Sequence, residues 1–200
     1  MMGKTRWYHV NQGFTVAELI VIVAILGILA AIAAPSWLNL LTRQRLYDAR
    51  ANALDKIREA QNQAIRTARP WEACFRDRDG MVWVSVQPAG NARTVNNCRN
   101  HTNWQPLLEA GANTIAIKTI NSPPTGIGTS KELGDPTDGY SFRFGPFGDR
   151  FGMGAARLQL VFVPRGQNRG PFYCVYSESI IGALREGTIG RDPTNPTRCR

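Results

Sequence analysis

A nearly unbroken apolar run close to the N-terminus constrains this chain more than any other feature. Residues 16–34 contain a single ionisable side chain, Glu18, and are otherwise aliphatic or small. A helix needs about 20 predominantly apolar residues to cross the hydrocarbon core of a bilayer. The run is therefore long enough for a membrane-spanning helix. A charged residue inside such a helix is costly unless it pairs with another group or has a function.

The residues before this run are not in the order of a secretory signal peptide. Such a signal has its cleavage site, marked by small residues, after the apolar segment. Here a polar leader with Lys4 and Arg6 is followed by Gly13 and Phe14, and the apolar run comes after them. Cleavage between Gly13 and Phe14 would leave the apolar helix at the start of the mature protein.

This order resembles the class III signal of type IV pilins and pseudopilins. In that match Gly13 precedes the cleaved bond, Phe14 is the new N-terminus, Glu18 is the fifth mature residue and Pro35 the twenty-second. The resemblance implies cleavage by a prepilin peptidase and N-methylation of Phe14. It also implies that Glu18 pairs with the α-amino group of Phe14, in the same subunit or in a neighbour. The alternative is an ordinary signal anchor in which Glu18 reaches the membrane interface.

A second apolar pattern continues the helix beyond Pro35. Apolar residues at steps of three and four form one stripe on an Arg-rich helix. They are Leu46, Ala49, Ala53, Ile57, Ala60, Ala64 and Ala68, and Pro70 follows. We therefore predict one long helix over residues 15–69, stopped by Pro70. A kink is expected at Pro35, because proline lacks the N–H that a helix interior needs.

The chain after Pro70 has the pattern of strands and turns. The Asp79-Gly80 turn predicts a hairpin of residues 71–76 and 81–86, ended by Pro88. A loop is predicted at residues 89–103, and further strands at residues 114–120, 140–144, 157–163 and 172–181, separated by Gly- and Pro-rich loops. A long helix followed by antiparallel strands indicates an α+β fold, with the second half of the helix packed on one face of a sheet.

These patterns predict four parts along the chain. They are a cleaved leader (residues 1–13), a transmembrane or filament-core helix (14–35), an amphipathic helix half (36–70) and a β-rich head (71–200). The pilin resemblance implies the same architecture. The head is similar to the general-secretion H pseudopilin and Fim T minor pilin group at residues 60–66, 71–75, 140–145 and 180–182.

The cysteines indicate disulfides rather than a metal. There are four, Cys74, Cys98, Cys174 and Cys199, all in the part expected outside the cytoplasm. An even number in an oxidising compartment favours two disulfides. Pairing of sequence neighbours is the simplest of the three connectivities that four cysteines allow. Zinc is not expected, because no Cys-x-x-Cys pair occurs and neither His9 nor His101 has the spacing of a ligand.

The sequence favours assembly over catalysis. It has no Gly-x-Ser-x-Gly, His-Glu-x-x-His or Walker loop, so we expect neither an enzyme nor a cofactor. The resemblance predicts a minor pilin or pseudopilin subunit. Such a subunit would cross the inner membrane once, with a periplasmic head. It would then assemble with other pilin or pseudopilin subunits, through its N-terminal helix, into a type IV pilus or a type II secretion pseudopilus.

Nucleic acid is the alternative partner. The formal charge is +9 at pH 7, and basic side chains bind phosphates. Some Fim T type minor pilins are thought to capture DNA through a Gly-Arg-x-Arg motif near the C-terminus, where this chain has Gly190-Arg191-Asp192-Pro193. The motif is interrupted, so the candidate DNA-binding residues are Arg185, Arg191, Arg198 and Arg200. The alternative function is a DNA-binding minor pilin in natural transformation, and the alternative to any binding role is a solvated basic tail.

Overall fold

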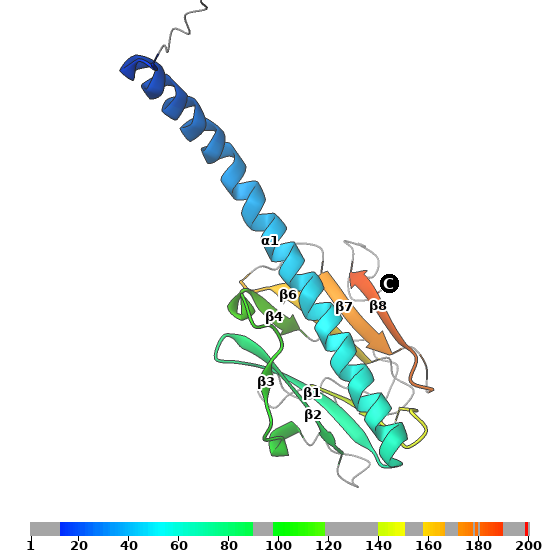
Figure 1. Ribbon diagram of the computed structural model, residues 1–200. Coiled ribbons are helices and arrows are strands. Elements are labelled where there is room, and N and C mark those ends of the chain that lie inside the picture. Colours follow the sequence, from blue (N-terminus) through cyan, green and yellow to red (C-terminus); the bar gives the residue numbers. More distant parts are fainter. Residues whose placement is uncertain are drawn as a thin grey trace, which may run out of the picture. The chain divides into compact units, whose positions relative to one another are not determined.

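The computed structural model describes residues 13–89, 98–118, 140–150, 158–166, 172–177, 179, 181–189 and 199. The chain divides into two compact units, Met1–Leu41 and Thr42–Arg200. One helix, α1 (Val16–Thr67), has residues in both units (Figure 1). The second unit contains the end of this helix and every strand in the described part of the chain.

The helix ends two residues earlier than predicted, and backbone geometry explains the difference. Ala68 adopts a left-handed conformation with φ 49°. The Arg69 N–H donates to the carbonyl oxygen of Ala64 at 3.3 Å, a bond that closes the last turn. The helix therefore ends at Thr67, before Pro70 is reached. It continues through Pro35, and the kink there stays a prediction.

In the described part of the chain, eight strands form two antiparallel sheets of four strands each. Sheet A has the order β3-β2-β1-β5, and sheet B has the order β4-β6-β7-β8. In chain order the bounds are β1 Trp71–Arg78, β2 Met81–Pro88, β3 Gln105–Pro106, β4 Ile115–Lys118, β5 Tyr140–Phe144, β6 Leu158–Pro164, β7 Phe172–Ser177 and β8 Leu184–Ile189. The predicted α+β fold is confirmed, but its strands form two sheets rather than one.

The strand predictions fail mainly near the C-terminus. The predicted strand over residues 172–181 ends at Ser177, because the chain turns between β7 and β8. In that turn the Gly182 N–H donates to Ser179 O at 3.2 Å, and Gly182 has a φ of 80°. Strand β8 was not predicted, since its residues carry little apolar alternation. The predicted loop over residues 89–103 contains a short 3-10 helix, Cys98–Asn100, and residues 90–97 lie outside the described part.

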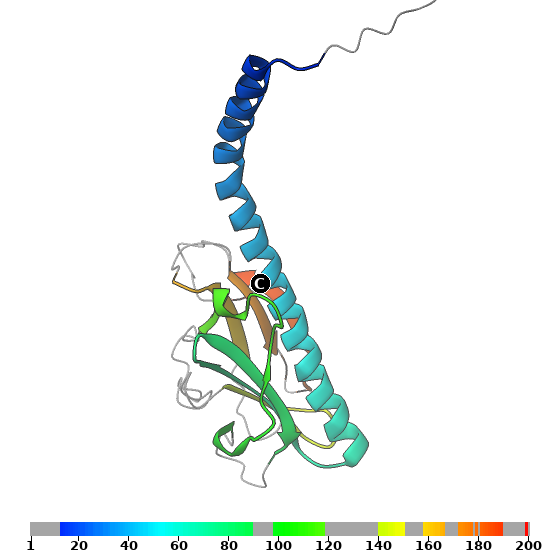
Figure 2. The same cartoon turned by 60° about the vertical axis from the view of Figure 1, so that its left-hand side comes forward.

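One core joins the second half of α1 to both sheets. The predicted stripe is buried except at Ala68, which lies beyond the end of the helix. The same core cluster contains Phe75 and Phe142 from sheet A together with Phe162 and Val175 from sheet B. Figures 1 and 2 show this half of the helix running along both sheets. Its many alanines let the helix backbone lie close to the strands.

Gln61 fastens the helix to one loop from each sheet. Its side-chain Nε2 donates to the carbonyl oxygens of Gly148, at 2.8 Å, and of Gly182, at 3.2 Å. Gly148 follows β5 of sheet A, and Gly182 lies between β7 and β8 of sheet B. A Cβ atom on Gly182 would collide with the Gly148 carbonyl oxygen, so only glycine fits there. Gln61 and Gly182 fall within two of the segments that carry the head resemblance, and Gly148 lies three residues after a third.

Candidate functional site

The first turn of α1 is built around Thr15 and Glu18. The Thr15 hydroxyl accepts a hydrogen bond from the Glu18 N–H at 3.3 Å, and the Thr15 carbonyl accepts one from the Leu19 N–H at 3.2 Å. The first N–H groups of a helix lack partners within it, and a threonine cap supplies one. A carboxylate in the first turn also interacts favourably with the helix dipole. The Thr15-x-x-Glu18 spacing is the sequence signal for such a cap, and the cap was not predicted from it.

The helix surface beyond this turn is apolar and exposed. Every described side chain in residues 13–32 is exposed, including Val16 at 78% and Ile32 at 72%. A Cβ atom built on Gly27 would meet nothing within 4 Å, so no contact within the described residues requires glycine there. Contiguous apolar surface on this scale marks an interaction with a membrane or with another protein. Gly27 suits the second, because small residues let packed helices approach closely.

Two segments of α1 have to be combined before the helix is long and apolar enough to cross a membrane. In the described part of the chain no single helix is long and apolar enough to cross a membrane. One bent pair, Val16–Ile32 with Trp37–Thr67, has the length and composition to do so. Pro35 lies between these two segments, within the continuous helix α1.

The predicted cleavage residues lie immediately before the helix. Gly13 and Phe14 are both exposed, and Phe14 is 77% exposed. The rest of the predicted leader, residues 1–12, lies outside the described residues. The structure thus places the predicted cleavage point, the capped turn and Glu18 in consecutive positions at the head of the apolar surface.

The structure contains two disulfides, and both join sequence neighbours. Cys74 on β1 is bonded to Cys98 in the 3-10 helix, and Cys174 on β7 is bonded to Cys199. All four residues are buried. These are the two pairs that the sequence favours.

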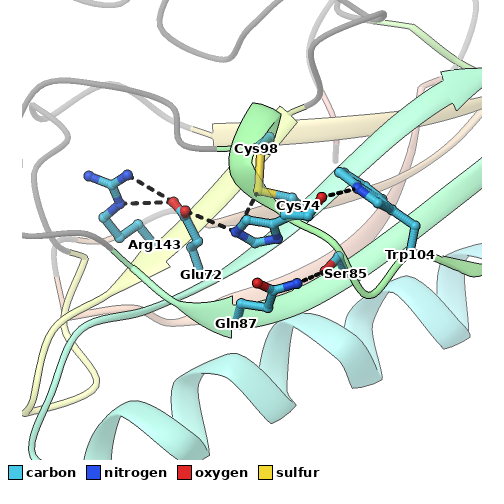
Figure 3. Close-up of a disulfide and its surroundings, with 8 residues drawn as sticks. Glu72, Cys74, Ser85, Gln87, Cys98, Trp104 and Arg143 are labelled. Carbon is cyan, nitrogen blue, oxygen red and sulfur yellow. Dashed lines mark hydrogen bonds and ion pairs between the residues drawn. A yellow bond between two sulfur atoms is a disulfide. The ribbon is translucent and has the colours of Figure 1, made fainter.

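A buried polar cluster that the sequence did not predict lies beside the Cys74–Cys98 disulfide (Figure 3). Glu72 on β1 is fully buried, and its two carboxylate oxygens have different partners. Arg143 on β5 donates to Oε2 from Nε at 3.1 Å and from Nη2 at 2.8 Å. His101 Nε2 lies 3.1 Å from Oε1 of the same carboxylate and 3.6 Å from Cys74 Sγ. The cluster therefore combines an ion pair, an imidazole and a disulfide.

The segment that carries His101 is held on sheet A by Trp104. The indole Nε1 of Trp104 donates to the carbonyl oxygen of His101 at 2.7 Å. The Arg76 guanidinium lies 3.9 Å from the centre of the Trp104 ring, a cation–π contact. Burial, together with the nearby Arg78 charge, lowers the pKa of Arg76. The sequence signal for this site is the Cys98-x-x-His101 spacing, and the site was not predicted from it.

The predicted DNA-binding residues are only partly described. Arg185 is exposed on β8. Arg191, Arg198 and Arg200 lie outside the described residues, although Cys199 between the last two is described and buried. DNA binding through these four residues stays a prediction.

Comparison with known families gives a match at the N-terminal segment. Residues 9–34 match the family described as the prokaryotic N-terminal methylation motif. This motif contains Gly13, Phe14 and Glu18, the residues on which the pilin resemblance rests. It is a motif of type IV pilins and supports the function of a pilus subunit.

A curated protein with significant similarity is the type IV major pilin protein PilA of Myxococcus xanthus (strain DK1622). It is 43% identical over 51 residues, which cover 26% of this chain and 23% of PilA. The chain thus matches about a quarter of the length of this relative. No solved structure matches the chain.

Proposed function

We propose that this protein is a minor pilin or pseudopilin subunit that assembles through its N-terminal helix into a type IV pilus or a type II secretion pseudopilus. The observation that carries the proposal is the uncovered apolar surface of α1, headed by a capped turn with one carboxylate. The match of residues 9–34 to the methylation motif supports it. Similarity of the head to the H-type and Fim T group favours the minor or pseudopilin role.

The proposal gives the apolar helix two successive environments. Before assembly it crosses the inner membrane, with the head in the periplasm and the leader on the cytoplasmic side. A prepilin peptidase cuts between Gly13 and Phe14, and the new N-terminus is methylated. After assembly the same surface packs against the helices of other subunits. Burial of apolar side chains away from water stabilises both states.

Glu18 sets the register of assembly in this proposal. A carboxylate in an apolar helix costs about 2.5 to 3.5 kcal/mol on insertion scales. Pairing with the positively charged N-terminus of Phe14 offsets that cost. A neighbouring subunit whose Phe14 is one helical turn out of place would leave both charges buried and unpaired, which is strongly unfavourable. The ion pair therefore selects one position of the neighbouring subunit along the filament axis.

The first experiment is mass spectrometry of the mature N-terminus. We expect a chain that begins with N-methylated Phe14. A chain that keeps the leader would contradict the proposal and would favour an ordinary signal anchor.

The second experiment compares Glu18→Ala with Asp48→Ala, which removes an exposed carboxylate from α1 outside the apolar run. Both variants should remain in the membrane fraction, because neither loses apolar length. The amount of the Glu18→Ala chain recovered in sheared filaments should be lower than that of the parent by at least about tenfold, which corresponds to about 1.4 kcal/mol. Asp48→Ala should be incorporated normally. Incorporation of Glu18→Ala at the level of the parent chain would contradict the role of Glu18.

A further inference from the structure

We propose that the reduced form of this chain binds one Zn²⁺ ion beside β1. The ligands are the thiolates of Cys74 and Cys98, Nε2 of His101 and Oε1 of Glu72. The disulfide form described above is then the metal-free form of the same site. This inference is independent of the pilin assignment, because it concerns only the head.

The donor atoms already lie together. One ligand atom each from Glu72, Cys74 and His101 falls within 4.8 Å of the others, and all three residues are buried. Cys98 Sγ is in the same place, because it is bonded to Cys74 Sγ at 2.02 Å. Two sulfurs, one imidazole nitrogen and one carboxylate oxygen make a donor set that suits tetrahedral zinc.

The change needed to admit the ion is small. Two thiolates on tetrahedral zinc, each about 2.3 Å from the metal, have their sulfurs about 3.8 Å apart. After reduction the sulfurs would have to separate by roughly 2 Å, which side-chain rotation can supply. The two cysteines have Cα atoms 5.6 Å apart. The Cys98-x-x-His101 spacing lets one short segment provide two of the ligands.

Charge balance favours the same assignment. A buried site must be close to neutral, because each unpaired buried charge is costly. In the disulfide form the Arg143 guanidinium balances the Glu72 carboxylate at 2.8 Å. In the zinc form two thiolates and one carboxylate are balanced by Zn²⁺ and the same guanidinium. Both forms are therefore neutral when His101 is neutral.

Arg143 also has the position of an outer-shell partner. It bonds Oε2 of Glu72 and leaves Oε1, on the His101 side, for the metal. Ligating carboxylates in metal sites are usually hydrogen-bonded in this way, which fixes their orientation. In the zinc form, as in the disulfide form, the segment from Cys98 to Trp104 stays fastened to sheet A.

The conversion between the forms is a two-electron exchange. A dithiol reductant supplies two electrons and two protons, so that the Cys74–Cys98 bond becomes two thiols and the reductant becomes a disulfide. Zinc binding then releases the two thiol protons. In the reverse step a disulfide oxidant accepts two electrons from the thiolates, takes up two protons and leaves as a dithiol, so that the Cys74–Cys98 bond forms again and the ion is released.

The test uses the full chain in detergent micelles, in a Cys174→Ser/Cys199→Ser background that leaves one cysteine pair. The chain is reduced with a phosphine, which takes up oxygen from water to form the phosphine oxide. Zinc binding is measured by competition with a chromogenic chelator, and Co²⁺ serves as a spectroscopic substitute. We expect one Zn²⁺ per reduced chain, none in the oxidised chain, and Co²⁺ spectra with thiolate charge-transfer bands.

His101→Asn tests the ligand set, and His9→Asn is its matched control in the uncleaved chain, since His9 is the other of the two histidines in the sequence. Loss of the His101 ligand should weaken zinc binding by more than about 100-fold, since changes in outer-shell partners alone cost about 10- to 100-fold. His9→Asn should bind zinc like the parent. Equal affinity of the His101→Asn chain, or no zinc on the reduced parent, would overturn the proposal.

Reduction could also unfold the head, and circular dichroism follows that outcome. In that case zinc should restore the β-sheet signal of the reduced parent, because metal binding supplies folding free energy. The His101→Asn chain should stay unfolded at the same zinc concentration. Failure of zinc to refold the parent would equally overturn the proposal.

Discussion

Arg143 donates two hydrogen bonds, from Nε and Nη2, to a single carboxylate oxygen of Glu72. The two residues are direct partners in the register of β1 and β5. Glu72 is 0% exposed and Arg143 3% exposed. Neither charge can recover solvation if its partner is removed, so the pair is far more sensitive to single than to double substitution.

Glu72→Gln should therefore lower the free energy of unfolding by about 3 to 5 kcal/mol, because it leaves the Arg143 charge buried and uncompensated. The double variant Glu72→Gln/Arg143→Met should recover part of that loss. Glu59→Gln is the control, because Glu59 belongs to an exposed pair with Lys56. It should change stability by no more than about 1 kcal/mol. Urea unfolding followed by circular dichroism measures all three, and equal effects at Glu72 and Glu59 would contradict the buried pair.

Gly182→Ala should destabilise the head more than Gly166→Ala. Both glycines have positive φ angles, 80° and 76°, so alanine is strained at either position by about 1 to 2 kcal/mol. A Cβ atom at Gly166 meets nothing within 4 Å, whereas one at Gly182 collides with the Gly148 carbonyl. The collision should add about 1 to 3 kcal/mol. Similar thermal shifts in the two variants would show that Gly182 does not contact Gly148.

Removal of either disulfide should destabilise the chain to a similar extent. The bonded cysteines are 24 and 25 residues apart in sequence. Closure of loops of this length stabilises a fold by about 3 kcal/mol in the chain-entropy account. Cys174→Ser/Cys199→Ser and Cys74→Ser/Cys98→Ser should each lose roughly that amount in urea unfolding. A negligible loss in one variant would show that its disulfide is not formed in the folded protein.

Ionisation of Tyr173 should lower the stability of the folded head at alkaline pH. Burial, followed by its hydrogen bond with Tyr47, raises the pKa of Tyr173 above its ordinary value near 10. The neutral phenol is therefore favoured in the folded state. The neutral phenol contributes fully to the free energy of unfolding at pH values below the pKa of Tyr173 in the unfolded chain. This contribution is lost as the pH rises through the higher pKa of Tyr173 in the folded chain. The parent should lose stability above about pH 10 more steeply than Tyr173→Phe.

The measurement is urea unfolding over a series of alkaline pH values, with tyrosinate absorbance as an independent record of ionisation. Tyr8→Phe is the control, with all variants compared as the uncleaved chain, because it removes a tyrosine from the predicted leader and none from the head. It should leave the pH dependence of stability unchanged. The same alkaline slope in the Tyr173→Phe chain as in the parent would contradict the assignment.

The elements that follow from local patterns were predicted, and those that depend on distant partners were not. The stripe from Leu46 to Ala64 repeats every three or four residues, and the Asp79-Gly80 turn sets the first hairpin, so both can be read from short windows. Strand β8 has no such pattern, because it is an edge strand in which only half of the residues are exposed and they do not alternate regularly with buried ones. The second sheet was missed because strand pairing is not encoded in periodicity.

The functional residues show the same contrast between local signals, which were predicted, and distant partners, which were not. Gly13, Phe14 and Glu18 were found because their spacing is short and fixed. Glu72 was not found, because a charged residue in a strand is ordinarily expected to face solvent. Its burial depends on Arg143, which lies 71 residues later in the chain. Gln61 was singled out only as part of a resemblance, since its two carbonyl partners lie 87 and 121 residues away.

The shared core of α1 and the two sheets has a consequence for the order in which the head can form. The helix precedes every strand in the chain, yet its alanine stripe is covered partly by β6 and β7, and Arg50 pairs with Glu186 on β8 at 2.9 Å. A chain delivered from its N-terminus therefore exposes the stripe until nearly the last residues arrive. The full core can close only after β6 and β7 have been added, and a truncation before β8 would also remove the ion pair between Arg50 and Glu186 rather than merely an edge.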